Sequence, residues 1–269
     1  REREATELVM ELGEKYDRIV CSGGDGTMNE VANGMMRLHE KPICGYIPAG
    51  TVNDFASSLR IPKIMRHAAE LVTQGKVFRC DLGSFNDKFF TYVAGFGAFT
   101  EVSYTTPQEW KNMLGKTAYF IEGLKHLAEI KPHHMRITYD DGVVEDDFVL
   151  GLVSNSVSVA GYKAYQKEDI KMDDGLFEVL FIRDLKNALE LQEVLNALLT
   201  KHLDATKMFR CSSRHLHIVS DDEVQWTLDG EDGGSWDEVD LFNHQQVLPI
   251  ICGDEALEDI SSQMGEEPV

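Results

Sequence analysis

The chain has 269 residues, of which 46 are acidic and 26 are lysine or arginine, giving a formal net charge of −20. This excess of acid argues against nucleic acid as a partner, because binding to phosphates relies on clustered lysine and arginine. The length and the 43% hydrophobic content suit two ordinary folded domains. No run approaches the roughly 18 apolar residues that span a bilayer, so we expect a cytoplasmic protein.

The first third of the sequence alternates helical and strand patterns. Apolar residues repeat at helical spacing over 5–12, and "DRIVCS" and "PICGYIPAG" are short β-rich runs. Further helical patterns occupy 28–35 and "IPKIMRHAAELVTQGK", which Gly75 closes. This alternation predicts an α/β domain with parallel strands over 1–84, and the acidic tail 253–269 is expected to fray or to rejoin it.

From about Gly83 the pattern changes to short strands separated by turns, which predicts an antiparallel β-sandwich over 85–252 with helical insertions at 111–130 and 186–200. The lysine-bearing insertion at 111–130 fits either ordinary packing or contact with a bilayer. His133 and His134 are expected in a loop without zinc. The five scattered cysteines are expected to be reduced, buried thiols. An exposed sandwich edge would allow a homodimer.

The stretch "SGGDGTMNE" follows a strand and leads into a helix expected to begin at Thr27. Its three glycines lack a Cβ, so the backbone can approach a ligand closely, and the first helical amides form an anion site. The loop suits a phosphate, although it is neither a GxGxxG nor a Walker motif. Asp25 would repel a phosphate unless a cation lay between them, which predicts magnesium. A tight turn with no ligand is the alternative interpretation.

A second loop, "PAGTVNDFA" over 48–56, also ends a strand and opens a helix. In open α/β sheets, ligands bind at the carboxyl ends of the strands, so two such loops favour one shared site. Asp54 is interpreted either as the N-cap of the second helix or as a member of a metal network.

Together these loops resemble the bacterial diacylglycerol kinase family of lipid kinases, whose relatives include sphingosine and ceramide kinases. The likeness continues through "CDLG", "VAGFGAFTEVSY", "GKTAYFIEGLK", "KMDDGLFEV" and "LDGE", and so extends over almost the whole chain. It implies a Rossmann-like, NAD-kinase-like nucleotide domain joined to a β-sandwich that holds the lipid. It also implies transfer of the γ-phosphate of ATP to a lipid hydroxyl, most simply diacylglycerol to phosphatidic acid, by a protein peripheral to the cytoplasmic membrane face. Family members normally begin with a strand and an Asn-Pro loop, so the first domain is expected to lack its first strand and to bind ATP poorly without it.

The resemblance also implies roles for individual residues. It assigns nucleotide contacts to Gly23, Gly24, Asp25, Gly26, Thr27, Met28, Asn29, Glu30 and Thr51. It places Asp25, Asp54 and Asp81 in an aspartate–water–magnesium network that makes Asp25 catalytic. A second, structural magnesium would be bound by the Asp174 side chain and the main-chain carbonyls of Lys171 and Leu176. Glu231 would be the general base that takes the proton of the lipid hydroxyl.

The residues leave alternatives open at several of these positions. Asp81 could instead be a hydrogen-bonding residue at the domain junction, and the "DDG" turn could carry only exposed carboxylates. The Asp-Gly of "LDGE" could be a plain hairpin turn, with Asp229 and Asp232 as rival acids. An NAD kinase also uses a GGDGT loop, although an Asn-Thr-Gly loop is then expected downstream. A lipid-binding or nucleotide-binding regulator without turnover is the alternative from another class.

Overall fold

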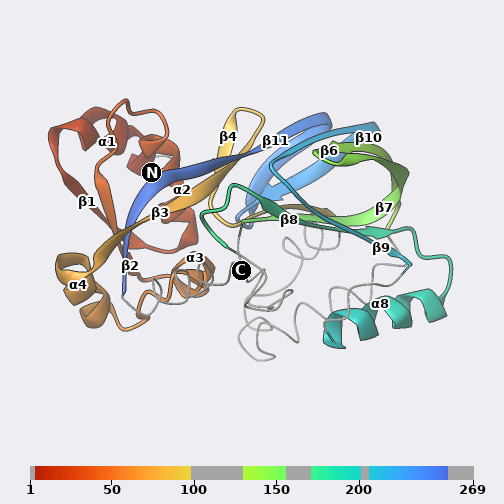
Figure 1. Cartoon of the computed structure of the whole chain (residues 1–269), viewed down its shortest axis with the longest axis horizontal. Helices are drawn as coiled ribbons and strands as arrows, with labels where there is room; N and C mark the ends of the chain where they lie inside the picture. The colour runs from red at the N-terminus through yellow and green to blue at the C-terminus, as the bar shows by residue number, and fades with distance from the viewer. Residues whose placement is uncertain (1–3, 98–129, 156–170, 201–205, 254–269) are drawn as a thin grey trace, which may run out of the picture.

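The computed structural model describes residues 4–97, 130–155, 171–200 and 206–253 (Figure 1). The predicted insertion at 111–130 and the tail beyond Gly253 lie almost entirely outside these residues. Among the helices that are described, none is both long enough and apolar enough to cross a bilayer.

The elements of the first part alternate as the sequence predicts. In chain order they are α1 (Glu4–Leu12), the 3₁₀ turn η1 (Gly13–Lys15), β1 (Arg18–Gly23), α2 (Asp25–Met35), β2 (Ile43–Pro48), α3 (Asp54–Ser58) and α4 (Met65–Gln74). Strand β1 pairs in parallel with β2, from Arg18 opposite Ile43 to Gly23 opposite Pro48. The two glycine-containing loops therefore leave the sheet at the same edge.

The remaining elements are mostly antiparallel strands. They are β3 (Lys76–Phe85), β4 (Lys88–Phe90), β5 (Val93–Gly97), β6 (His133–Tyr139), β7 (Gly142–Ser154), β8 (Phe177–Arg183), the helix α8 (Ala188–Thr200), β9 (Met208–Ser213), β10 (His215–Leu228) and β11 (Glu231–Cys252). The two long strands β7 and β10 each pair with β6 along one half and with β5 along the other, so these four strands close on one another.

Strand β11 joins the two halves of the molecule. Its first part pairs with β10, and its last part pairs in parallel with β2, through Ile250 opposite Cys44. Strand β3 runs antiparallel beside β11 along most of its length, with an irregularity between His244 and Leu248. In Figure 1 both strands extend from the α/β half into the β-rich half. The boundary predicted at residue 84 falls at the end of β3, and it stays a prediction.

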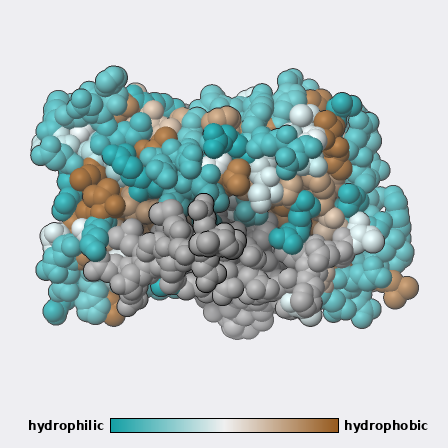
Figure 2. All heavy atoms as spheres, viewed as in Figure 1, coloured by the Kyte–Doolittle hydropathy of each residue, from teal (hydrophilic) through white to brown (hydrophobic). Residues whose placement is uncertain are grey.

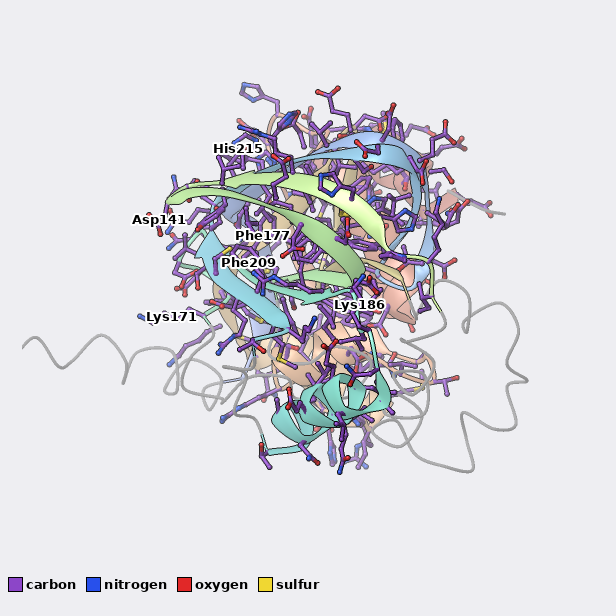
Figure 3. The ribbon with its side chains drawn as sticks, turned by 90° about the vertical axis from the view of Figure 1, so that its right-hand side faces the viewer. Asp141, Lys171, Phe177, Lys186, Phe209 and His215 are labelled. Atoms are coloured by element: carbon purple, nitrogen blue, oxygen red, sulfur yellow. The ribbon has the colours of Figure 1, made fainter. Side chains whose placement is uncertain are left out.

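Two hydrophobic cores support these halves. One lies around the helices and parallel strands and extends to β8 and α8. The other is aromatic and fills the β-rich half, where Trp226 contacts Phe85 and Phe96 at ring-centroid distances of 5.1 and 4.9 Å. Figure 3 looks at this half from the side and labels Phe177 on β8 and Phe209 on the neighbouring β9, which pair with Ser213 and Phe181 respectively. All five cysteines are free, as predicted, and four are buried; the prediction of burial was wrong for Cys211, which is half-buried.

Two local predictions were wrong. His133 and His134 are not in a loop but open β6, where they pair with Phe148 and Asp147 of β7. The strand therefore begins two residues before Met135, which with Ile137 enters the aromatic core. Helix α2 begins at Asp25, two residues earlier than expected.

Candidate active site

The two loops contact each other through their backbones. A Cβ on Gly50 would lie 2.6 Å from the Cα of Gly24, and a Cβ on Gly24 would lie 3.3 Å from the Cα of Gly50. The Ala49 amide also donates to the Gly23 carbonyl over 2.8 Å. Only residues without side chains permit this approach, so the glycines bring the ends of β1 and β2 into one surface.

Hydrogen bonds of the Asp25 side chain link the glycine loop at 23–26 to α3, the helix that follows the second loop. Its carboxylate accepts the amide of Asp54 at 3.1 Å and the amide of Phe55 at 3.3 Å, which are the first two amides of α3. Amides at a helix start have no partner within the helix, and the Asp25 side chain accepts two of them. The Asp25 side chain, which the sequence placed beside a phosphate loop, therefore has partners within the protein, independently of any cation.

Asp54 is not the N-cap of α3. That position is Asn53, whose left-handed φ of 53° turns its side chain back to bond the Gly50 amide and carbonyl. Asp54 is the first helical residue, and its side chain is only 1% exposed. The N-cap interpretation was wrong, and Asp54 is a buried residue whose amide bonds Asp25 at the joined loops.

Glu231 reaches the same surface from the other half of the molecule. It is exposed at the start of β11, and its Oε1 lies 3.4 Å from the position that a Cβ on Gly26 would occupy. The turn before it is a two-residue hairpin with positive φ at both Asp229 (53°) and Gly230 (85°). That conformation is the one preferred between twisted strands. The turn therefore presents the Glu231 carboxylate to the glycine loop.

The rival acid Asp229 is a buried anchor of this turn. Its carboxylate accepts five hydrogen bonds between 2.7 and 3.1 Å, from the Thr91 amide and hydroxyl, the Tyr92 and Val93 amides and the Asn29 side chain. Burial raises its pKa, and these donors oppose that rise. Asp229 thus has no free approach to a substrate hydroxyl, and it ties the hairpin both to β5 and to α2.

The other rival, Asp232, points to the surface of the hairpin. Its Oδ1 accepts the Gln225 side-chain amide at 2.6 Å and the Gly234 amide at 2.9 Å. Both partners lie on the exposed side of β10 and β11. Of the three acids at this turn, Glu231 is the one that faces the glycine loop.

Tyr92 also lies at this site, although the sequence did not indicate it. Its hydroxyl donates to the Asp229 carbonyl over 2.9 Å. Burial is the main reason that its pKa is raised, and the negative charges of four acids add to it: Asp229, Asp25, Asp54 and Glu231. These charges act on one buried ring because the two loops and the hairpin converge there. Nothing in the spacing of "FFTYVAGF" marks that tyrosine.

The remaining predicted nucleotide residues face different directions. Thr27 and Thr51 are exposed near the loops, and the Thr27 side chain covers Gly23. Met28 is fully buried in the core, so only its backbone could contact a ligand. Asn29 bonds Asp229 and the Phe89 carbonyl, and Glu30 accepts the Ala5 amide of α1 at 3.1 Å.

Asp81 lies in a second acidic group. One of its oxygens accepts the Gly175 amide at 2.6 Å and the other the Gln246 amide at 2.7 Å, so it does join separate segments as a junction residue would. Burial raises the pKa of Asp81 to about 6, and the charges of Asp174 and Asp173 add to that rise. The Asp81 carboxylate thus bonds the 172–175 segment and β11, whereas the Asp25 carboxylate bonds α3.

The predicted structural magnesium site lies beside Asp81. Asp174 Oδ1 accepts the Leu176 amide at 3.0 Å, and burial raises the pKa of Asp174. Lys171 precedes this turn, and Figure 3 shows it at the side of the β-rich half. In the described parts of the chain no three acidic, histidine or cysteine side chains are grouped to hold a metal. A site here would need main-chain oxygens or water as further ligands.

Comparisons with known proteins identify the family of this fold. Residues 1–85 match the family model "Diacylglycerol kinase catalytic domain", and 93–250 match "YegS C-terminal NAD kinase beta sandwich-like domain". The fold and the matched catalytic domain thus define a lipid kinase.

The chain belongs to the diacylglycerol kinase family. It is 35% identical to a diacylglycerol kinase of Staphylococcus saprophyticus over 85% of this chain and 75% of that protein. It is 33% identical to one of Bacillus subtilis over 87% of this chain and 78% of that protein. A crystal structure of a diacylglycerol kinase from Bacillus anthracis str. Sterne has a TM-score of 0.79 and 27% identity, covering 95% of this chain and 84% of that one. An NAD kinase from Archaeoglobus fulgidus, with a TM-score of 0.50 and 14% identity over 94% of this chain and 84% of that one, shares the fold alone.

Proposed function

We propose that this kinase transfers the γ-phosphate of ATP to the hydroxyl of diacylglycerol, giving phosphatidic acid and ADP, at the cytoplasmic face of a membrane. The observation that carries the proposal is the position of the Glu231 carboxylate against Gly26 of the glycine loop. A proton acceptor beside a phosphate loop is the pair of features that transfer to a hydroxyl requires. The names of the relatives support diacylglycerol as the acceptor.

In this mechanism the backbone of Gly23–Gly26 and the first turn of α2 hold the phosphates through outward amides. Glu231 accepts the proton of the lipid hydroxyl while its oxygen forms a bond to the γ-phosphorus. The bond from that phosphorus to the bridging oxygen of ADP breaks at the same time, so ADP leaves with the electron pair. Asp229 does not touch the reacting atoms; it holds the turn that carries Glu231.

Magnesium fits this site by the chemistry of its donors. Asp25 bonds two amides but keeps further lone pairs, and Asp54 is buried next to it. Magnesium is commonly bound by one or two carboxylates with waters and substrate phosphates, so a group of three acids is not required. When bound, the ion would neutralise phosphate charge. We propose Asp25, Asp54 and, through water, Asp81 for this ion, and Asp174 with the Lys171 and Leu176 carbonyls for a structural one.

The test is transfer of labelled γ-phosphate from ATP to diacylglycerol, sphingosine, ceramide and NAD, each with and without magnesium. We expect labelled phosphatidic acid, only with magnesium. Label on sphingosine or NAD would keep the chemistry and replace the proposed acceptor. ATP binding without label on any acceptor would overturn the proposal in favour of a binding regulator.

A further inference from the structure

The segment between α3 and α4 differs in charge from the rest of the chain. Although the chain has 46 acidic residues, none lies between Phe55 and Ala69, whereas Arg60, Lys63 and Arg66 do. This stretch is thus locally cationic in a molecule whose formal net charge is −20. An anionic surface would attract this stretch and repel most of the remaining surface.

Exposed apolar side chains lie among these cations. Ile64 is 61% exposed and Met65 is 51% exposed, side by side where α4 begins. Lys63, Arg66 and His67 around them are exposed as well, and together these five residues form what we call the 63–67 patch. Figure 2 shows a surface that is mainly hydrophilic with separate hydrophobic areas. Two large adjacent apolar side chains flanked by cations are typical of a surface that enters a membrane interface.

The fold fixes how this patch is presented. Buried Ile61 precedes it, and Ala68 and Val72, in the next two turns of α4, are buried against the α/β half. The patch is therefore held on a packed helix. Arg66 pairs with Glu70 over 3.0 Å, but both side chains are more than half exposed, so the pair is weak and lipid phosphates can compete for the arginine.

We infer that the 63–67 patch docks this kinase on an anionic membrane surface, with Ile64 and Met65 inserted and the cations on lipid headgroups. The inference rests on the proposed function, because a diacylglycerol acceptor lies in a membrane. Helices α3 and α4 lie on the same side of the molecule in Figure 1. If the patch docks on a membrane, the side of the molecule that carries α3 therefore faces the lipid. The first amides of α3 bond Asp25 of the glycine loop.

The test is co-sedimentation with vesicles of phosphatidylcholine alone or mixed with phosphatidylglycerol, without ATP. We expect the wild type to bind the mixed vesicles much more tightly. Ile64→Glu with Met65→Glu, and separately Lys63→Gln with Arg66→Gln, should each lower that affinity at least about tenfold, since each cation near the surface contributes about fivefold. The matched control is Val143→Glu with Val219→Glu, which places two acids on half-exposed valines of the β-rich half and should change binding little.

Phosphorylation of a short-chain diacylglycerol dissolved below its micelle concentration separates this inference from the proposed function. The patch variants should phosphorylate that dissolved acceptor at the wild-type rate and lose activity only on vesicles. If they bind mixed vesicles as the wild type does, or if the wild type binds without regard to anionic lipid, docking through the patch is refuted while the kinase activity stands. Absence of phosphorylation of every acceptor would refute the proposed function and leave the sedimentation result to decide the docking.

Discussion

A substitution at Asp229 is the most exacting test of the site, because Asp229 holds the turn from which Glu231 reaches the glycine loop. We consider Asp229→Asn, which keeps the size of the side chain and tolerates the left-handed φ of 53° at this position. The carboxylate accepts two backbone amides on Oδ1 and three donors on Oδ2. In the variant one of these oxygens becomes an NH₂ group, which cannot accept.

The loss can be worked out from these contacts. Whichever way the amide turns, at least two buried donors lose their acceptor, and each costs about 1–3 kcal/mol. Removal of a buried charge returns part of this, because burial disfavours the ionised form. We expect the free energy of unfolding to fall by about 2–4 kcal/mol, which is at the upper end for a conservative change.

The assay is urea unfolding together with steady-state phosphorylation, measured well below the melting temperature of the variant. We expect kcat to fall while the KM for ATP changes little, because the turn positions Glu231 and not the phosphates. Asp232→Asn, two residues beyond the turn and exposed, is the control and should stay within about 0.5 kcal/mol. Wild-type stability of Asp229→Asn would refute the anchor, and lost stability with unchanged kcat would show that Asp229 supports the fold without positioning the base.

Three further changes probe the rest of the site. Glu231→Gln should lower kcat by about 10²–10⁴-fold and leave ATP affinity nearly unchanged, because it removes a proton acceptor only; unchanged turnover would exclude Glu231 as the base. Gly50→Ala should weaken ATP binding and lower the melting temperature, since its Cβ would lie 2.6 Å from the Gly24 backbone, and wild-type ATP titration by calorimetry would contradict the contact. Asp174→Ala should lose both activity and the stabilisation by magnesium in thermal melts; a melting temperature that still rises with magnesium as in the wild type would argue against a structural ion there.

The sequence predicted the α/β half well because its signals are local. Strand patterns ending in glycine-containing loops at 23–26 and 49–50 were enough to place two loops at one edge of a parallel sheet, and they meet there. Strand β9 was missed because "MFRCSS" has only Met208 and Ser213 fully buried and resembles a polar connection. The pairing of β6 with both β7 and β10 also depends on contacts far apart in sequence, which no local pattern encodes.

The same difference between local and long-range signals separates the site residues that could be predicted from those that could not. Asp25 and Glu231 could be proposed from motifs, because the glycine loop and the Asp-Gly turn are short-range signals. Any role for Tyr92, and the contact of Asn29 with Asp229, could not be proposed, since these bonds span 137 and 200 positions of the chain. The sequence presented Asp229 as a rival base, and only its five buried donors show that it is an anchor.

The position of Asp25 changes what its charge implies about magnesium. In the sequence, a carboxylate beside a phosphate loop required a cation to be tolerated at all. In the structure both Asp25 oxygens accept amides from the start of α3, so the side chain has hydrogen-bond partners within the protein before any ligand arrives. A phosphate entering the loop then meets an acid that is already hydrogen-bonded to the start of α3, next to the buried Asp54. Magnesium would therefore be needed for the phosphates and not for the fold of the loop, so its removal should abolish transfer while leaving the joined loops intact.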